Sequence, residues 1–398
     1  MMFIELILGG ITGLLIGMIT GLVPGIHLNL ASAVTVTILS QMRILSPFFA
    51  SALIVSMMIS HNLFDFIPSV FLCAPDEEKT VSVLPGHRML LEGRGMEAVL
   101  YSILGSLAGL VFSAIIFIPF WLILPIIYGM SRVIVGFVLI GVVCIMIFRE
   151  SKNRAFAFIL VMLAGTLGFL TFALGVKDPL LPLLSGLFGI SVLLGNFSVG
   201  STIPPQLLDL PHFKIRPIVL PAFFGSLVGT MLNIFPGVGP SQASIISLSV
   251  LKVKRKEFVI STVNAVSTGS LFGSFVALSA IGKARNAPLA SIQQLLQPTL
   301  SLVISLAIVA IITTLLCSVL VLSLAPFFLK IIAKFKYNQI TIFILAVVVA
   351  LVIIRSGLLG LLVLATGTFL GLAAHFEGAG KHHLMASLLL PTASYFIF

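Results

Sequence analysis

Apolar residues fill runs of roughly 20 positions along this chain, and short polar islands separate the runs. A helix of about 20 residues crosses ~30 Å of hydrocarbon, so the pattern predicts membrane helices. The period-two alternation that membrane strands require is absent from the sequence. We expect helices at 47–73, 97–121, 133–148, 155–174, 178–196, 258–282, 299–325, 340–354, 356–374 and, as a short last segment, 384–398.

Two further apolar stretches are interrupted by a Pro-Gly pair. The first contains "GLVPGIHLNL" at 21–30, which separates 3–23 from 28–40. The second contains "NIFPGVGPSQAS", which separates 218–235 from 240–251. Proline removes a backbone donor and glycine adopts conformations that a helix does not use. Each stretch is therefore predicted to be a broken pair of helices.

The second half of the chain repeats the first. At an offset of 212 positions, residues of the same type coincide more often than the one or two matches that chance gives in about twenty positions. Gly13, Leu15, Gly17, Pro24, Gly25, Ala31 and Ser32 match Gly225, Leu227, Gly229, Pro236, Gly237, Ala243 and Ser244. We therefore predict one membrane domain made of a first repeat at 1–197, a proline-rich connector at 198–217 and a second repeat at 218–398.

The composition supports this interpretation. Hydrophobic residues make up 59 % of the 398 positions and charged residues 9 %, whereas soluble proteins carry about 25 % charged residues. The mean hydropathy is +1.24. The chain is predicted to be an all-α integral membrane protein of the cytoplasmic membrane. Its net charge of +10 is spread over the loops, which suggests contacts with anionic lipids and excludes a concentrated nucleic-acid surface.

The distribution of basic residues predicts how the two halves are oriented. If the loops at 76–95, 149–154, 197–217, 252–257, 326–338 and 375–383 face the cytoplasm, 16 of the 22 Lys and Arg residues lie inside. The first loop after the broken pair then lies outside in the first half and inside in the second, so the repeats are inverted. About five crossings per half give this inversion only if each broken pair is a re-entrant hairpin with a Pro-Gly tip.

The hairpin tips are candidate anion sites. A helix that begins after Pro-Gly presents unpaired N–H groups and the positive end of its dipole, which favour a bound anion. Two such tips from inverted halves would face one shared cavity, and side-chain donors lie close to both. The predicted substrate-binding residues are Gly25, His27 and Asn29 at the first tip and Gly237, Gly239, Ser241, Gln242 and Ser244 at the second. The alternative is a pair of proline kinks within a packed bundle.

The helix after the first hairpin carries the only carboxylate deep in a predicted span, Asp65. A charge at that depth is costly unless it is paired or protonated. His61 lies one turn earlier on the same face. We predict coupling to protons or sodium through Asp65, His61 and Asn62, and in the second half through Asn264, Thr268 and Ser270, with Ser267 beside them. The alternative is a structural His–Asp pair.

The segment "HFEGAGKHH" at 375–383 has no metal-site spacing, so we expect a solvated loop and no metal or other cofactor there.

These segments resemble the TctA-type large membrane subunit of tripartite tricarboxylate transporters. The resemblance is carried by "GLVPGIH", "NIFPGVGPSQAS", "GHRMLLEGRGMEAVLYSILGSLAGL", "VNAVSTGS" and "LLQP", and it covers most of the chain. It implies a secondary transporter that takes up carboxylates on a proton or sodium gradient. It also implies two partners, a small membrane subunit and an extracytoplasmic solute-binding protein. The chain departs from the family at "PGIHLN" and "SHNLFDFIPSVFLCAPDEE", which leaves the substrate open.

Two other functions are alternatives to carboxylate transport. Translocases of polyprenyl-phosphate lipid carriers also combine Pro-Gly hairpin tips with inverted repeats, and a helix N-terminus suits a phosphate as well as a carboxylate. An intramembrane enzyme is the third possibility, but the sequence holds no HExxH, no GxSxG and no paired catalytic carboxylates. We therefore predict a transporter for an anionic substrate and no enzymatic activity.

Overall fold

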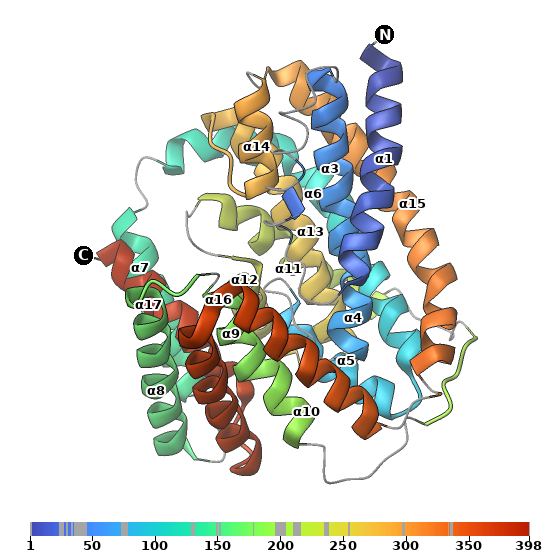
Figure 1. Ribbon diagram of the computed structural model, residues 1–398. Coiled ribbons are helices and arrows are strands. Elements are labelled where there is room, and N and C mark those ends of the chain that lie inside the picture. The colour runs from blue at the N-terminus through green and yellow to red at the C-terminus, as the bar shows by residue number, and fades with distance from the viewer. Residues whose placement is uncertain are drawn as a thin grey trace.

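Every regular element of the described chain is a helix, as the hydropathy pattern predicts (Figure 1). The computed structural model describes residues 2–23, 28, 31, 32, 35, 46–72, 79–128, 132–148, 150, 153–177, 179–195, 204–209, 216–234, 239–253, 255–296, 299–332, 334 and 337–397. Eight of its helices are long and apolar enough to cross a membrane. Large apolar side chains such as Phe3, Ile118 and Phe369 are exposed on the outer surface, where lipid replaces water. The chain is a multi-pass membrane protein.

The helices lie mostly on the predicted ranges. In the first half they are α1 (Met2–Leu22), α3 (Pro47–Phe64), α4 (Phe66–Phe71), α5 (Thr80–Leu91), α6 (Gly95–Tyr128), α7 (Arg132–Phe148), α8 (Arg154–Ala173), α9 (Leu180–Leu184), the π-helix η1 (Ser185–Ile190) and α10 (Ser191–Gly195). In the second half they are α11 (Arg216–Met231), the 3-10 turn η3 (Leu232–Ile234), α12 (Pro240–Leu251), α13 (Lys256–Ile281), α14 (Ala287–Leu295), α15 (Leu300–Ile332), α16 (Tyr337–Phe376), the 3-10 turn η4 (Lys381–Met385) and α17 (Ala386–Ile397). Helices α6 and α15 extend past the predicted ends at 121 and 325, and the predicted helix 178–196 is divided into three elements. The predicted helix 28–40 lies largely outside the described residues.

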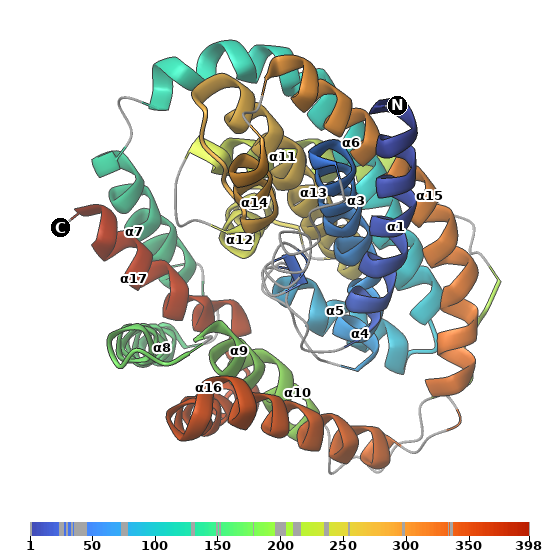
Figure 2. The same cartoon turned by 45° about the horizontal axis from the view of Figure 1, so that its top comes forward.

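Two breaks interrupt the long predicted helices. The predicted helix 47–73 divides at Asp65 into α3 and α4. The predicted helices 340–354 and 356–374 form one element, α16, which is kinked at Gly357 (φ 67°, ψ −163°). Glycine adopts this positive φ without strain, so the helix can change direction there. Figures 1 and 2 show the two segments of α16 running in different directions.

Two expectations about loops were wrong. The segment 76–95, predicted to be a loop that faces the cytoplasm, contains α5, which packs against α4, α6 and α13. The segment 375–383, also expected to be solvated, leads into η4, where His383 is fully buried. Helix α14 was not predicted either. Each of these elements is shorter than an apolar run of membrane length, so the hydropathy pattern does not mark it.

The helices form two groups in space, and each group contains helices from both halves of the chain (Figure 2). The larger hydrophobic core is built mainly by α1, α3–α6, α11 and α13–α15. A second core is built by α7, α8, α9, η1, η4 and α17, and α16 contributes to both. Each group thus combines elements from before and after the proline-rich connector. The division into two inverted repeats stays a prediction.

Small residues allow close contacts between two helices within each half of the chain. A Cβ atom at Gly13 or Gly17 of α1 would overlap the backbone of α3, and one at Gly229 of α11 would overlap the backbone of α13. Lipid supplies no hydrophobic force between helices, so close backbone contact is their main source of attraction. The α1–α3 pair and the α11–α13 pair therefore both pack through glycines that contact the partner backbone. A duplicated sequence would produce this similarity.

Candidate functional site

The two most enclosed membrane helices carry the polar residues of the candidate site. Of the most apolar part of each span, 83 % is buried for Pro47–Phe71 and 89 % for Lys256–Ile281, compared with 22 % for Gly95–Tyr128. Polar groups so far from water must be hydrogen-bonded within the protein. The contacts of these side chains therefore indicate what the centre of the molecule holds.

A buried lysine lies at this centre. Lys79 precedes α5, and its side chain is fully buried. Its Nζ atom donates to Asn62 Oδ1 of α3 at 3.1 Å and to Asn264 Oδ1 of α13 at 2.7 Å. The asparagine amides are oriented by bonds of their own. Asn62 Nδ2 donates to Ser267 Oγ at 2.7 Å, and Asn264 Nδ2 donates to the Ile260 carbonyl at 2.8 Å.

This network changes the interpretation of the predicted coupling residues. Asn62 and Asn264 are brought together as expected, but their amide oxygens bind the Lys79 ammonium group. Sequence reasoning placed Lys79 in a cytoplasmic loop, because a single lysine between two apolar segments usually marks a loop. The amphipathic sequence "TVSVLPGHRMLL" that follows it was the available sign of a packed helix.

Asp65 and His61 are both buried near the break between α3 and α4. Asp65 Oδ2 accepts a hydrogen bond from Ser69 Oγ at 3.1 Å, one turn further along the chain. His61 Nδ1 lies 3.0 Å from Thr20 Oγ1 of α1. These contacts place both groups inside the bundle, as the sequence predicts. The proposed pair between His61 and Asp65 stays a prediction.

The remaining predicted coupling residues have structural contacts. Thr268 lies against Gly109 of α6, at a close approach between α6 and α13. The Ser270 carbonyl accepts a hydrogen bond from Asn233 Nδ2 of η3 at 3.1 Å. Both contacts hold α13 against its neighbours. Of Ser267, Thr268 and Ser270, the described structure places Ser267 in the Lys79 network, through its hydrogen bond with Asn62.

Helix α12 begins where the second hairpin tip was predicted. Its N-cap is Gly239, whose N–H donates to Gln242 Oε1 at 2.9 Å, and Ser244 Oγ donates to the Pro240 carbonyl at 2.8 Å. Gln242 and Ser244 thus bond within their own helix. Ser241 is fully buried at the positive end of the helix. Gly25, His27, Asn29 and Gly237 lie outside the described residues, so the shared cavity of the two tips stays a prediction.

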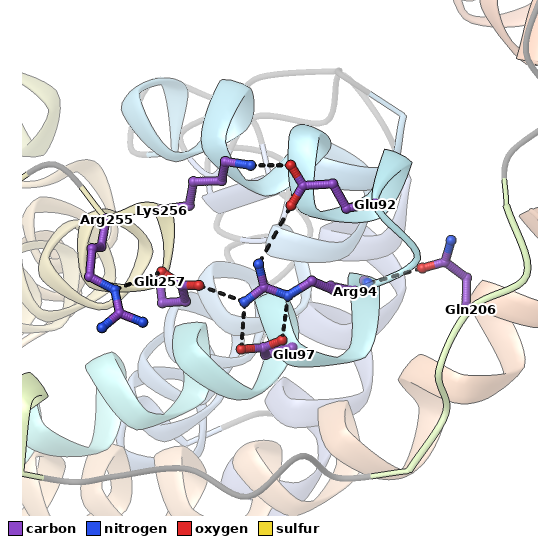
Figure 3. Close-up of polar contacts among 8 residues, drawn as sticks. Glu92, Arg94, Glu97, Gln206, Arg255, Lys256 and Glu257 are labelled. Carbon is purple, nitrogen blue, oxygen red and sulfur yellow. Dashed lines mark hydrogen bonds and ion pairs between the residues drawn. The ribbon is translucent and has the colours of Figure 1, made fainter.

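An ion-pair cluster fixes the ends of the helices that hold the lysine network (Figure 3). Arg94, between α5 and α6, binds Glu97 through Nε and Nη2 at 2.7 and 2.8 Å. Its Nη2 also donates to Glu257 of α13 at 2.5 Å. Hydrogen bonding to Glu97 is the main reason that the pKa of Arg94 is raised. Two turns after Glu257, α13 presents Asn264, so the cluster fixes the height of that residue in the bundle.

Two outer contacts complete this cluster (Figure 3). Lys256 of α13 pairs with Glu92, and Gln206 of the connector accepts a hydrogen bond from the Gly95 N–H at 2.9 Å. Gln206 also donates to the Leu90 carbonyl at 2.9 Å. The connector and the start of α13 are therefore both tied to the turn between α5 and α6.

A second buried histidine, His87, is expected to make the stability of the protein depend on pH. His87 of α5 donates from Nδ1 to the Val70 carbonyl of α4 at 3.0 Å, and burial lowers its pKa to about 4. Between about pH 6.5 and 4 the unfolded chain binds a proton that the folded protein excludes. We therefore expect stability to fall as the pH drops through this window, by up to roughly 3 kcal/mol from this residue. Thermal melts at pH 4.5 and pH 7 should differ less for His87→Asn than for the wild type. An equal difference in both proteins would contradict this role.

Glu150, His382 and His383 are the three described side chains whose separation would suit a metal ion, with ligand atoms within 4.8 Å of one another. Glu150 Oε2 already accepts bonds from His383 Nε2 at 3.0 Å and from the Gly380 N–H at 3.3 Å. These bonds hold the start of η4 against the end of α7. The sequence offered no sign of the cluster, because Glu150 lies more than 200 positions before the histidines.

Comparison with known proteins identifies the family to which the chain is similar. The model of the family described as "Tripartite tricarboxylate transporter TctA family" matches residues 7–386. A protein of Methanocaldococcus jannaschii, described as "Uncharacterized protein MJ1079", is 28 % identical over 356 residues, which cover 86 % of this chain and 88 % of the relative. No solved structure matches the chain.

Proposed function

Because this chain belongs to the tripartite tricarboxylate transporter TctA family, we propose that it is a secondary transporter for a di- or tricarboxylate. The observation that carries this proposal is the fully buried ammonium group of Lys79, which lies between the two most enclosed helices. A carboxylate deep in a membrane needs a positive partner. Lys79 supplies this charge, and the N-terminus of α12 adds a partial positive charge at Ser241.

The asparagines give Lys79 a defined resting position. The ammonium group donates to two amide oxygens, which are neutral acceptors. An arriving carboxylate forms a charge-assisted hydrogen bond that is roughly twice as strong as a neutral one. The lysine can therefore turn toward the substrate and return to the amides after release. The site is stabilised in both states, as a carrier that moves between two faces requires.

Asp65 is the group that we propose for coupling. Asp65→Asn keeps the size and hydrogen bonding of the side chain but removes its titratable carboxyl group. We expect gradient-driven carboxylate uptake to be lost, while binding and exchange of substrate continue. Uptake and counterflow of labelled citrate in vesicles, with a proton or a sodium gradient, would measure this. Normal gradient-driven uptake by Asp65→Asn would show that Asp65 has a structural role only.

The family implies two partners, a small membrane subunit and an extracytoplasmic solute-binding protein. We propose that both act with this chain in the cytoplasmic membrane. The function itself is tested on the purified chain by titration with citrate, succinate, acetate and a polyprenyl phosphate. Saturable binding of citrate or succinate is expected. Saturation by the polyprenyl phosphate alone would instead favour a lipid-carrier translocase.

A further inference from the structure

Arg285 carries two hydrogen-bond donors that the fold does not use. It lies in the turn at 282–286, between the end of α13 and the start of α14. Its Nε and Nη2 atoms are buried, and neither has a hydrogen-bond partner in the part of the chain that the structure describes. A buried donor without a partner costs free energy, and the cost is larger when the group is charged. Such groups are rare in native proteins, and a bound ion is one of the partners that satisfy them.

The ring of Tyr128 orients the guanidinium group. Arg285 Cζ lies 5.0 Å from the centre of this ring, and Tyr128 is the last residue of α6. The cation–π contact occupies one flat face of the guanidinium group. Nε and Nη2 lie in the plane of the group along one edge, where their hydrogens match the two oxygens of a carboxylate. The arrangement therefore suits a bidentate bond to a planar oxyanion.

Arg285 and the ion-pair cluster lie at opposite ends of α13. Helices α6 and α13 both begin at that cluster, where Arg94 binds Glu257. Their far ends also pack together, with Leu124 of α6 and Ala277 of α13 in one hydrophobic cluster. The 26 residues of α13 span ~39 Å, more than the ~30 Å of hydrocarbon. Because the loop before α13 is predicted to face the cytoplasm, Arg285 is expected at the outer face.

The turn that carries Arg285 also contacts α3. Asn286, the next residue, donates from Nδ2 to Met58 Sδ of α3 at 3.7 Å, and α14 packs against α3. Helices α3 and α13 are the two most enclosed spans, and they supply the asparagines that bind Lys79. Arg285 therefore belongs to the same pair of helices as the internal lysine.

We propose that Arg285 forms a binding site for a carboxylate group of the substrate at the extracytoplasmic face. The inference rests on the proposed transport function and adds a site that the substrate occupies before it reaches Lys79. The buried position of Nε and Nη2 favours a small organic anion, because a lipid headgroup is held at the membrane surface by its acyl chains. Arg285 is partly exposed, so this site should bind citrate more weakly than the buried Lys79 does.

A tryptophan placed beside Arg285 tests this inference on the purified protein. The sequence contains one tryptophan, Trp121. Trp121→Phe together with Tyr128→Trp therefore gives a reporter protein whose single indole ring lies against Arg285 and keeps the cation–π contact. Citrate should change the emission of this reporter in a saturable way. The change should persist when Lys79→Gln is added, because the two sites are separate.

Substitutions in the reporter protein assign the signal to Arg285. Arg285→Gln should weaken the citrate response by roughly tenfold or more. Arg285→Lys keeps the charge but lacks the paired donors, so it should restore little of the response. Lys283→Gln removes the same charge from an exposed position in the same turn and should leave the titration unchanged. Size-exclusion profiles would confirm folding, and Arg285→Lys decides the question if Arg285→Gln does not fold.

The outcomes separate this inference from the proposed function. If citrate binds to the protein but the reporter does not respond, or responds equally with Arg285→Lys, the Arg285 site is wrong and the transport proposal stands. If phosphatidylglycerol changes the emission and citrate does not, the group bound is a lipid phosphate and the small-anion site is wrong. If the wild type binds no carboxylate at all, both proposals fail.

Discussion

Lys79→Gln is expected to reduce citrate or succinate binding by about 100-fold or more, and to abolish carboxylate counterflow. Glutamine can still donate to Asn62 and Asn264, so the hydrogen bonds of the network survive while its charge is removed. Losing the positive partner of a buried carboxylate costs about 2–5 kcal/mol, which corresponds to this fall in affinity. Titration of the purified variant measures the effect directly.

The control for this experiment is Lys330→Gln, which removes the same charge from an exposed position near the end of α15 and should bind like the wild type. A second variant, Lys79→Arg, keeps the charge but changes its shape and should retain part of the binding. If Lys79→Gln is folded and binds carboxylates with wild-type affinity, Lys79 has a structural role and the proposed site is wrong.

Arg94→Met is expected to cause the largest loss of stability among the charged residues of the loops. It would leave Glu92, Glu97 and Glu257 close together without their shared cation. Like charges that lose a partly buried partner destabilise a protein by about 2–4 kcal/mol. We expect the apparent melting temperature in detergent to fall by roughly 5 °C or more.

Arg255→Gln is the matched control for the ion-pair cluster. Arg255 also pairs with Glu257, but at 3.6 Å and with 67 % of its side chain exposed. Exposed pairs contribute about 0–1 kcal/mol, so its melting temperature should change little. Equal melting temperatures for Arg94→Met and the wild type would show that the cluster does not anchor α13.

Much of the fold could be predicted from the sequence, because an apolar run of membrane length identifies a helix directly. The helix 240–251 was predicted with the bounds of α12, and the boundary between 340–354 and 356–374 lies within two residues of the kink at Gly357. Proline and glycine mark such points through backbone geometry alone. The burial of Asp65, Asn62 and Asn264 also followed, because each lies within an apolar run.

Other features depend on contacts between distant parts of the chain. The sequence after Lys79 indicates a packed helix, but it does not show that Lys79 itself is buried, since the partners that stabilise its side chain are on α3 and α13. The two groups of helices interleave both halves, and periodicity along one segment carries no information about this packing.

A structure of the protein with bound citrate tests the central claim most directly. We predict a carboxylate of the bound citrate within hydrogen-bonding distance of Lys79 Nζ and close to Ser241, with at least one of the bonds to Asn62 and Asn264 released. Citrate bound elsewhere, with Lys79 still held by both asparagines, would contradict the proposal that Lys79 is the internal charge that binds the substrate.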